Sequence, residues 1–131
     1  MKKRGILNAK LSYLIATLGR KDLFMIGDAE MTFPPKVEVV DLALTKGVPT
    51  FEQVLDAVLD EVEVDGYCMA HEVKEYNPEI EAHMEEKLPE AEDKFVPFDD
   101  LRKLGKHCRF AIRTGEATPH ANVILRTGHL D

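Results

Sequence analysis

The 131-residue sequence contains no tryptophan, only two cysteines and a single serine, and it has no long apolar run. The lone Ser12 lies in a segment with helical periodicity, away from any nucleophile elbow, so no serine nucleophile is expected. Cys68 and Cys108 fall in or beside predicted strands, where a free cysteine usually packs as a small apolar side chain, and we expect no disulfide. Polar residues interrupt the apolar stretch that follows Lys2-Lys3-Arg4. The sequence therefore predicts neither a signal peptide nor a membrane span, and it favours a cytoplasmic protein.

Positive charge is also scarce, with 17 Lys and Arg against 24 Asp and Glu and a formal net charge of −7. Nucleic-acid binding calls for a clustered positive surface, so this balance argues against a nucleic-acid partner. The pair His71-Glu72 begins like the zinc motif H-E-x-x-H, but Glu75 stands where the second histidine is required. No glycine-rich phosphate-binding motif is present. We therefore expect neither a metal nor a cofactor.

The composition is that of an ordinary globular protein, with 44% hydrophobic and 31% charged residues. A chain of this length suits one domain spanning 1–131. Helical periodicity predicts helices at 9–18, 51–62, 78–88 and 99–106. Short apolar or β-branched runs predict strands at 23–26, 37–40, 66–70, 95–96, 110–112 and 123–125. Strands that alternate with helices predict an α/β domain with a mixed, mostly parallel sheet.

Capping residues mark the ends of these helices. Asn8 is expected to cap the first helix, and Gly19 is expected to end it in a left-handed conformation. Thr50 and Gln53 form a capping box at the start of the second helix. Asn77-Pro78 predicts a capping asparagine followed by a proline at the first helical position.

A polar segment, 113–122, connects the last two predicted strands. Its hydroxyl, carboxylate, imidazole and amide groups belong to Thr114, Glu116, Thr118, His120 and Asn122. Such a loop suits a polyhydroxylated ligand, and the alternative is a solvated connection whose polar groups satisfy their own backbone. A hairpin-like return at Gly115 to Pro119 would place at least one antiparallel pair in the sheet.

Asp28 is the other candidate position, because it directly follows the predicted strand 23–26. In open α/β sheets, ligand sites lie beyond the carboxyl ends of strands. The alternative is an aspartate that only starts a turn.

The run Ile112 to Leu125 resembles the C-terminal signature of the D-ribose pyranase and L-fucose mutarotase family. The amino-terminal part of the chain agrees with that resemblance at Met1-Lys2-Lys3, Gly5 to Asn8, Leu18-Gly19, Asp22, Asp28-Ala29 and 41–49. The resemblance implies a three-layer α/β/α fold. It also implies a ring-shaped homo-oligomer, commonly a decamer of two pentameric rings, with sites near subunit boundaries.

The same resemblance implies a set of site residues. The positions that contact a monosaccharide in the family correspond here to Asp28, Phe98, His120, Ala121 and Asn122. The family's proton-donating histidine follows Leu-Gly after the first helix, and that position is Arg20 in this chain. An arginine stays charged at neutral pH and cannot exchange protons, so the family mechanism does not carry over intact.

Two further positions depart from the family pattern. Phe98 replaces a family histidine, and His120 replaces the aromatic residue of the Tyr-Ala-Asn triplet. An imidazole ordinarily titrates near neutral pH, so we expect His120 to supply the missing proton transfer; the alternative is that it only stacks on the ligand or hydrogen-bonds to it. Arg20 is expected to favour an anionic sugar, and its alternative is an exposed residue at a helix terminus.

The leading hypothesis is a sugar pyranase or mutarotase that opens and closes a hemiacetal ring by acid–base chemistry. The chain offers no nucleophile or metal motif for other chemistry, and this reaction requires neither. A second hypothesis is a sugar-binding protein of the same fold that has lost catalysis. A third is an α/β scaffold protein unrelated to the family.

Overall fold

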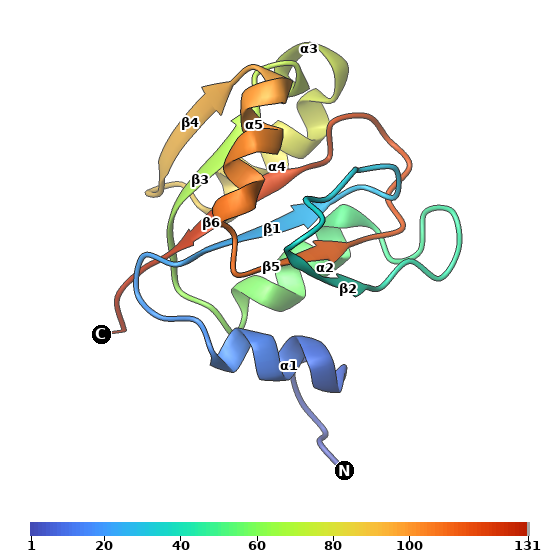
Figure 1. Ribbon diagram of the computed structural model, residues 1–131, viewed down its shortest axis with the longest axis vertical. Helices are drawn as coiled ribbons and strands as arrows, with labels where there is room; N and C mark the ends of the chain where they lie inside the picture. The colour runs from blue at the N-terminus through green and yellow to red at the C-terminus, as the bar shows by residue number, and fades with distance from the viewer. Residues whose placement is uncertain (131) are drawn as a thin grey trace.

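A six-stranded sheet forms the centre of the computed structural model, which describes residues 1–130 (Figure 1). The strands are β1 (Leu23–Gly27), β2 (Glu38–Asp41), β3 (Val64–Ala70), β4 (Glu92–Val96), β5 (Phe110–Arg113) and β6 (Val123–Thr127). Their order across the sheet is β2-β5-β1-β6-β3-β4. Strand β6 runs antiparallel to both of its neighbours, and the other three pairings are parallel. This confirms the mixed, mostly parallel sheet.

Helices cover both faces of this sheet and make three layers. They are α1 (Ala9–Ala16), α2 (Phe51–Leu59), α3 (Val73–Tyr76), α4 (Pro78–Lys87) and α5 (Phe98–Leu104), with a 3-10 turn at Gly105–His107. One core packs α1, α2 and α4 against the sheet through residues such as Leu14, Leu55 and Met84. A second core packs α5 against the opposite face through Leu101. In Figure 1, α5 lies in front of the sheet while α2 and α4 lie behind it.

The central strand β1 is covered on both faces. Phe24, Met25 and Ile26 are fully buried, with Phe24 and Ile26 in one core and Met25 in the other. The ring of Phe24 stacks on Phe110 at a centroid distance of 5.3 Å. Because both faces of β1 are buried, the strand has a continuous apolar run and lacks the alternation of a half-exposed strand. No helix within residues 1–130 has the length and apolar character that a bilayer crossing needs.

The helix ends differ from the sequence expectation at two places. The side chain of Asn8 does cap α1, but α1 ends at Ala16, and the left-handed residue that follows is Lys21 (φ 69°), not Gly19. The capping box at Thr50 is present. Asn77 makes no side-chain cap at the start of α4, because its side chain bonds to the polar loop instead. The short helix α3 was not expected.

The hairpin expected between the last two strands is wrong. Strands β5 and β6 are not neighbours, because β1 lies between them and pairs with both. The polar segment therefore crosses over the end of β1. This crossing places the loop next to Asp28, the residue that follows β1.

The strand directions gather the candidate residues at one edge of the sheet. All five strands other than β6 end there, and β6 begins there. Asp28 follows β1, Phe98 follows β4, and Asn122 precedes β6. Arg20 precedes β1 and therefore lies at the opposite edge, which a strand of five residues sets at a distance of roughly 16 Å.

Candidate functional site

The first half of the polar loop belongs to the framework and does not face a ligand. Thr114 is fully buried, and its hydroxyl donates to the carbonyl of Gly27 (2.9 Å) and accepts from the N–H of Glu116 (3.1 Å). The carboxylate of Glu116 accepts from the N–H of Phe51 at the start of α2 (2.8 Å) and from the hydroxyl of Thr118 (2.8 Å). These bonds satisfy a free helix N–H and fix the loop over β1. For these three side chains the alternative applies, in which the polar groups of the loop bond within the protein.

Two other segments hold the loop in place. The side-chain amide of Asn77 donates to the hydroxyl of Thr118 (2.9 Å) and to the carbonyl of Pro119 (2.8 Å). Gly115 packs against the loop that contains Val48, so closely that an added Cβ would lie 2.4 Å from the carbonyl oxygen of Val48. Glycine is required here by close approach of two backbones. The loop is therefore anchored at several points before it reaches His120.

Asp28 and Asn122 form a buried pair across the end of β1. The N–H of Asp28 donates to Oδ1 of Asn122 (2.8 Å), and the amide of Asn122 donates to Oδ2 of Asp28 (3.2 Å). The N–H of Glu30 donates to the other carboxylate oxygen, Oδ1 (3.0 Å). Burial raises the pKa of Asp28 above its usual value, although these hydrogen bonds act in the opposite direction. Asp28 is thus an oriented carboxyl group in a poorly solvated position.

His120 lies beside this pair in a strained backbone conformation. Its φ of 57° is in the left-handed region, where a residue with a side chain is uncommon and often belongs to a functional site. Its ring contacts Phe98 edge to face at a centroid distance of 5.4 Å, and Tyr76 at 5.8 Å. Nδ1 is buried and has no hydrogen-bond partner. Nε2 is therefore the ring nitrogen available to a ligand.

These side chains line an open cleft of about 290 Å³. Its walls are Asp28, Glu30, Met31, Thr32, Phe98, Arg102, Pro119, His120 and Asn122. Four of the five predicted sugar-contacting residues thus lie together. The exception is Ala121, whose side chain is fully buried in the core on the helix-rich face.

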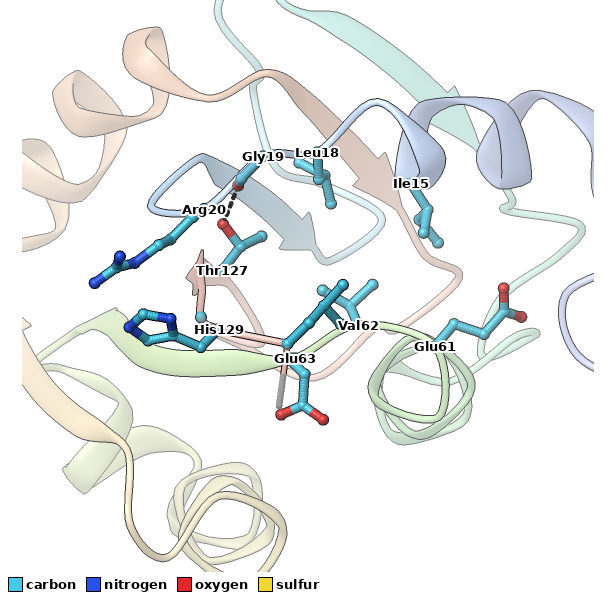
Figure 2. Close-up of a pocket in the computed structure, with 11 residues that line it drawn as sticks. Ile15, Leu18, Gly19, Arg20, Glu61, Val62, Glu63, Thr127 and His129 are labelled. Carbon is cyan, nitrogen blue, oxygen red and sulfur yellow. Dashed lines mark hydrogen bonds between the residues drawn. The ribbon is translucent and has the colours of Figure 1, made fainter.

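Arg20 is not among the residues of this cleft. Figure 2 shows it in a separate pocket of about 390 Å³, where its side chain lies on the same side as His129. Thr127 connects β6 to the segment before β1 on one wall of this pocket. Its hydroxyl donates to the carbonyl of Gly19, and its carbonyl accepts from the N–H of Lys21 (3.1 Å). Within one chain, Arg20 therefore cannot act on a ligand bound beside Asp28.

Glu72, which follows β3, lies next to Phe98 and therefore close to the cleft. One of its carboxylate oxygens accepts weakly from the N–H of Phe98 (3.4 Å), and the other lies 3.4 Å from Nδ1 of His71. Burial acts to raise the pKa of Glu72, but the backbone hydrogen bonds and the nearby imidazoles of His71 and His120 lower it overall. Glu72 is therefore a carboxylate beside the aromatic wall of the cleft.

Comparison with protein families decides the ancestry of this fold and cleft. A model of the family described as "RbsD / FucU transport protein family" matches residues 1–130. The chain belongs to this family. The resemblance inferred from the signature at 112–125 is thereby confirmed over nearly the whole sequence.

Individual members of the RbsD/FucU family agree with this assignment. The chain is 42% identical to the D-ribose pyranase of Geobacillus kaustophilus over 128 residues, which cover 98% of this chain and 94% of that protein. It is 41% identical to the D-ribose pyranase of Lactiplantibacillus plantarum over 128 residues, 98% of each chain. The structure of Bacillus subtilis RbsD complexed with D-ribose superposes with a TM-score of 0.96 at 37% identity over 100% of both chains.

A fucose mutarotase of Streptococcus pneumoniae, solved in complex with L-fucose, has a TM-score of 0.72 at 18% identity over 95% of each chain. That likeness shows a shared fold alone. The three-layer arrangement expected from the RbsD/FucU resemblance is thus found both in this chain and in its structural relatives.

Sequence reasoning missed several walls of the cleft. Glu30, Met31 and Thr32 lie in the loop that follows Asp28 and carry no pattern that marks them. Arg102 was detectable, because it stands four positions after Phe98 on the predicted last helix and so shares its face. The structure thereby places one cation at the cleft, and that cation is Arg102, not Arg20.

Proposed function

We propose that this protein is a pyranase or mutarotase that interconverts cyclic forms of a monosaccharide, D-ribose or a sugar similar to it. The observation that carries the proposal is His120 beside the buried Asp28–Asn122 pair, in one cleft of a chain of the RbsD/FucU family. Relatives named D-ribose pyranase, 41 and 42% identical over nearly the whole chain, support the choice of substrate class.

The reaction needs only a proton acceptor and a proton donor at a hemiacetal. Nε2 of His120 takes the proton of the anomeric hydroxyl, and the O–H electron pair becomes the second bond of the aldehyde. The bond between the anomeric carbon and the ring oxygen breaks with its electrons on that oxygen. The imidazolium then returns the proton to the ring oxygen. Closure through another hydroxyl, or on the other face of the aldehyde, gives a different cyclic form.

Asp28 binds and orients the sugar in this proposal. An ionised carboxylate can accept about four hydrogen bonds, and two positions on Asp28 are filled by Glu30 and Asn122. The remaining lone pairs are available to sugar hydroxyl groups. Asn122 fixes the carboxylate through the reciprocal pair of bonds, and Phe98 gives an apolar wall against which a sugar ring can lie.

The two departures from the family pattern in this cleft support the role of His120. Phe98 replaces a family histidine and His120 replaces a family aromatic residue, and their rings are in contact at 5.4 Å. The cleft therefore still contains one aromatic ring and one imidazole, with their positions exchanged. An imidazole at position 120 can supply the proton transfer that Arg20 cannot.

We further infer a cytoplasmic homo-oligomer, a decamer of two pentameric rings as in the family expectation, with Arg20 of a neighbouring copy near the cleft. The 16 Å that roughly separates Arg20 from Asp28 along β1 supports a site completed by two copies. No nucleic acid or membrane partner is proposed.

Exchange spectroscopy by NMR tests the function directly. The protein should accelerate interconversion of the cyclic forms of D-ribose, and His120→Gln should lower the exchange rate by roughly 10²- to 10⁴-fold while sugar affinity changes much less. His107→Gln, which removes an exposed imidazole outside the cleft, is the matched control and should leave the rate unchanged.

Two results would contradict parts of the proposal. Ligand-induced shifts without faster exchange would indicate the sugar-binding protein of the second hypothesis. A His120→Tyr variant with the activity and pH profile of the wild type would show that the imidazole is not the proton carrier.

A further inference from the structure

Two buried side-chain atoms in residues 1–130 lack a hydrogen-bond partner, Oε1 of Glu72 and Nδ1 of His120. The buried polar residues Asp28, Asn77, Thr114, Asn122 and Thr127 all make side-chain hydrogen bonds. An unsatisfied buried polar atom loses its hydrogen bonds to water without replacement, so such atoms are rare and call for an explanation. Here both unsatisfied atoms occur next to the proposed site.

Phe98 joins the two residues. Its N–H donates to Oε2 of Glu72 (3.4 Å), and its ring contacts the ring of His120 (5.4 Å). Glu72 and His120 therefore flank the same residue at the carboxyl edge of the sheet. They are also close enough for the imidazole of His120 to lower the pKa of Glu72.

The chemistry of the two unsatisfied atoms is complementary. An ionised carboxylate only accepts hydrogen bonds, and Nδ1 of a neutral imidazole can carry the ring hydrogen. When a carboxylate accepts from Nδ1–H, the lone pair of the neutral ring is placed on Nε2. Nε2 is the nitrogen that the proposed reaction uses.

Other charged and titratable groups surround His120 without being suited to this role. Asp28 is engaged by Asn122 and Glu30, and Glu30 lies with it on the loop after β1. Arg102 on α5 is a cation and His71 after β3 is an imidazole, so neither offers an anionic acceptor, and Tyr76 on α3 contacts the ring through its own aromatic ring. Glu72 is thus the carboxylate with a buried oxygen that accepts no hydrogen bond, although Nδ1 of the exposed His71 lies 3.4 Å from that oxygen.

We propose that Glu72 is a positioning residue that accepts a hydrogen bond from Nδ1–H of His120 and so keeps Nε2 free as the proton acceptor. The proposal rests on the proposed function for its catalytic consequence. In the sugar-bound protein this pair is closed, and both unsatisfied buried atoms gain a hydrogen-bond partner. The carboxylate also stabilises the imidazolium that exists while the proton is carried from the anomeric hydroxyl to the ring oxygen.

The decisive experiment is ¹⁵N NMR of the His120 ring in the full-length protein with saturating D-ribose. We expect the neutral ring to carry its hydrogen on Nδ1 in the wild type and to shift toward the Nε2–H form in Glu72→Gln. Glutamine can keep an oxygen toward the N–H of Phe98 while its NH₂ group replaces Oε1, so the fold should be retained. Glu75→Gln, which removes an equal charge from the exposed side of α3, is the control.

This readout does not depend on catalysis, so it separates the two proposals. Unchanged ring nitrogen signals in Glu72→Gln, or a wild-type ring already in the Nε2–H form, would overturn the role of Glu72 even if the enzyme is active. If ring exchange of sugars is absent but the tautomer changes as expected, the positioning contact stands and the proposed function fails.

Kinetics supply a second measurement. Loss of an outer residue that orients a catalytic group commonly lowers activity by roughly 10- to 100-fold, so kcat of Glu72→Gln should fall by that factor with little change in KM. Glu72→Asp, which keeps the carboxylate, should recover part of the loss. Equal activity in the Gln and Asp variants would contradict the proposal.

Discussion

At the scale of single residues, the cleft contains a carboxyl group whose position opposes its ionisation. Asp28 is 9% exposed, and burial raises its pKa even though three N–H or amide groups surround it. Such a group weakens the fold at neutral pH while it supplies a strong acceptor for sugar hydroxyls. Function and stability therefore make opposite demands at this position.

The pH dependence of stability should reveal this conflict. Because the folded-state pKa of Asp28 is raised, the stability it contributes is fully present below its unfolded value of about 3.8 and is lost as pH rises through the folded value. The difference in unfolding free energy between wild type and Asp28→Asn should therefore move in favour of the variant across that acidic window. Chemical denaturation from pH 3.5 to 7 measures it.

A control separates this effect from net charge. Glu86→Gln removes the same charge from the exposed surface of α4 and should show no such trend over the window. A pH-independent difference between wild type and Asp28→Asn would mean that burial of Asp28 is offset fully by its hydrogen bonds. The variant should also bind D-ribose more weakly, since a neutral amide replaces the carboxylate.

At this scale the family resemblance named Asp28, His120 and Asn122, and the structure brings these residues into one cleft. They meet because β1 ends and β6 begins at the same edge of the sheet, and both strands were predicted. Glu30 and Thr32 were not, because loop geometry has no periodic signal. The pairing of Glu116 with the N–H of Phe51 was also invisible, since it joins positions 65 apart in the chain.

At the scale of elements, the polar loop fastens α2 to the sheet. The carboxylate of Glu116 adds to the capping box of Thr50 and Gln53, and so it satisfies a further N–H at the first turn of α2. A negative group at a helix N-terminus is also favoured by the helix dipole. The loop therefore supports a helix that is distant in sequence.

Removal of this contact should be measurable as a loss of stability. Glu116→Ala should lower the unfolding free energy by about 1–2 kcal/mol, the usual effect of losing a helix cap, as read from denaturant midpoints at constant slope. Glu90→Ala, at an exposed position after α4, is the matched control. A loss no larger than that of Glu90→Ala would show that Thr50 alone caps the helix.

The elements themselves were well predicted, and their arrangement was predicted less well. Apolar periodicity is a local property, so α2 and β1 appear where the pattern places them. Strand order depends on contacts between distant segments. The sequence of a polar loop does not show whether the loop forms a hairpin between two neighbouring strands or crosses over a third strand. The sequence therefore could not show that β1 separates β5 from β6.

At the scale of the whole molecule, the site residues implied by the family resemblance lie at two opposite edges of the sheet. Asp28, His120 and Asn122 lie at the carboxyl edge, and Arg20 lies with His129 at the other. Large apolar side chains also remain exposed on a single chain, including Tyr13 (70%) and Leu44 (80%). The separation of Arg20 from the cleft agrees with the proposed assembly of several copies.

Light scattering should find a large homo-oligomer at micromolar concentration, and a stable monomer would count against the shared site. The sharper test takes Arg20→Ala and His120→Gln, each first shown to lower the exchange rate alone, and mixes them after partial unfolding and refolding together. If one copy supplies Arg20 and another supplies His120, mixed assemblies contain intact sites and should regain activity. If the mixture regains no activity while each variant is still oligomeric, Arg20 and His120 do not complete one shared site.

The predicted preference for an anionic sugar can be tested against two arginines. Arg102 lines the cleft of its own chain, and Arg20 reaches a cleft only from a neighbouring copy. Uronic acids should bind better than D-ribose in the wild type, and the charge-assisted contribution should be lost in the variant that removes the responsible guanidinium. Equal responses to neutral and acidic sugars in Arg20→Ala, Arg102→Ala and wild type would remove the hypothesis.

The anchoring of the polar loop has a consequence for how substrates diverge in such proteins. Thr114, Gly115 and Glu116 contact a strand, a neighbouring backbone and a helix, so these residues stabilise the fold whatever the ligand. Positions 98 and 120 instead line the cleft, although Phe98 also packs against the second core. In another chain, the presence of this loop therefore indicates the fold alone. The reaction of that chain must be inferred from the residues that line its cleft.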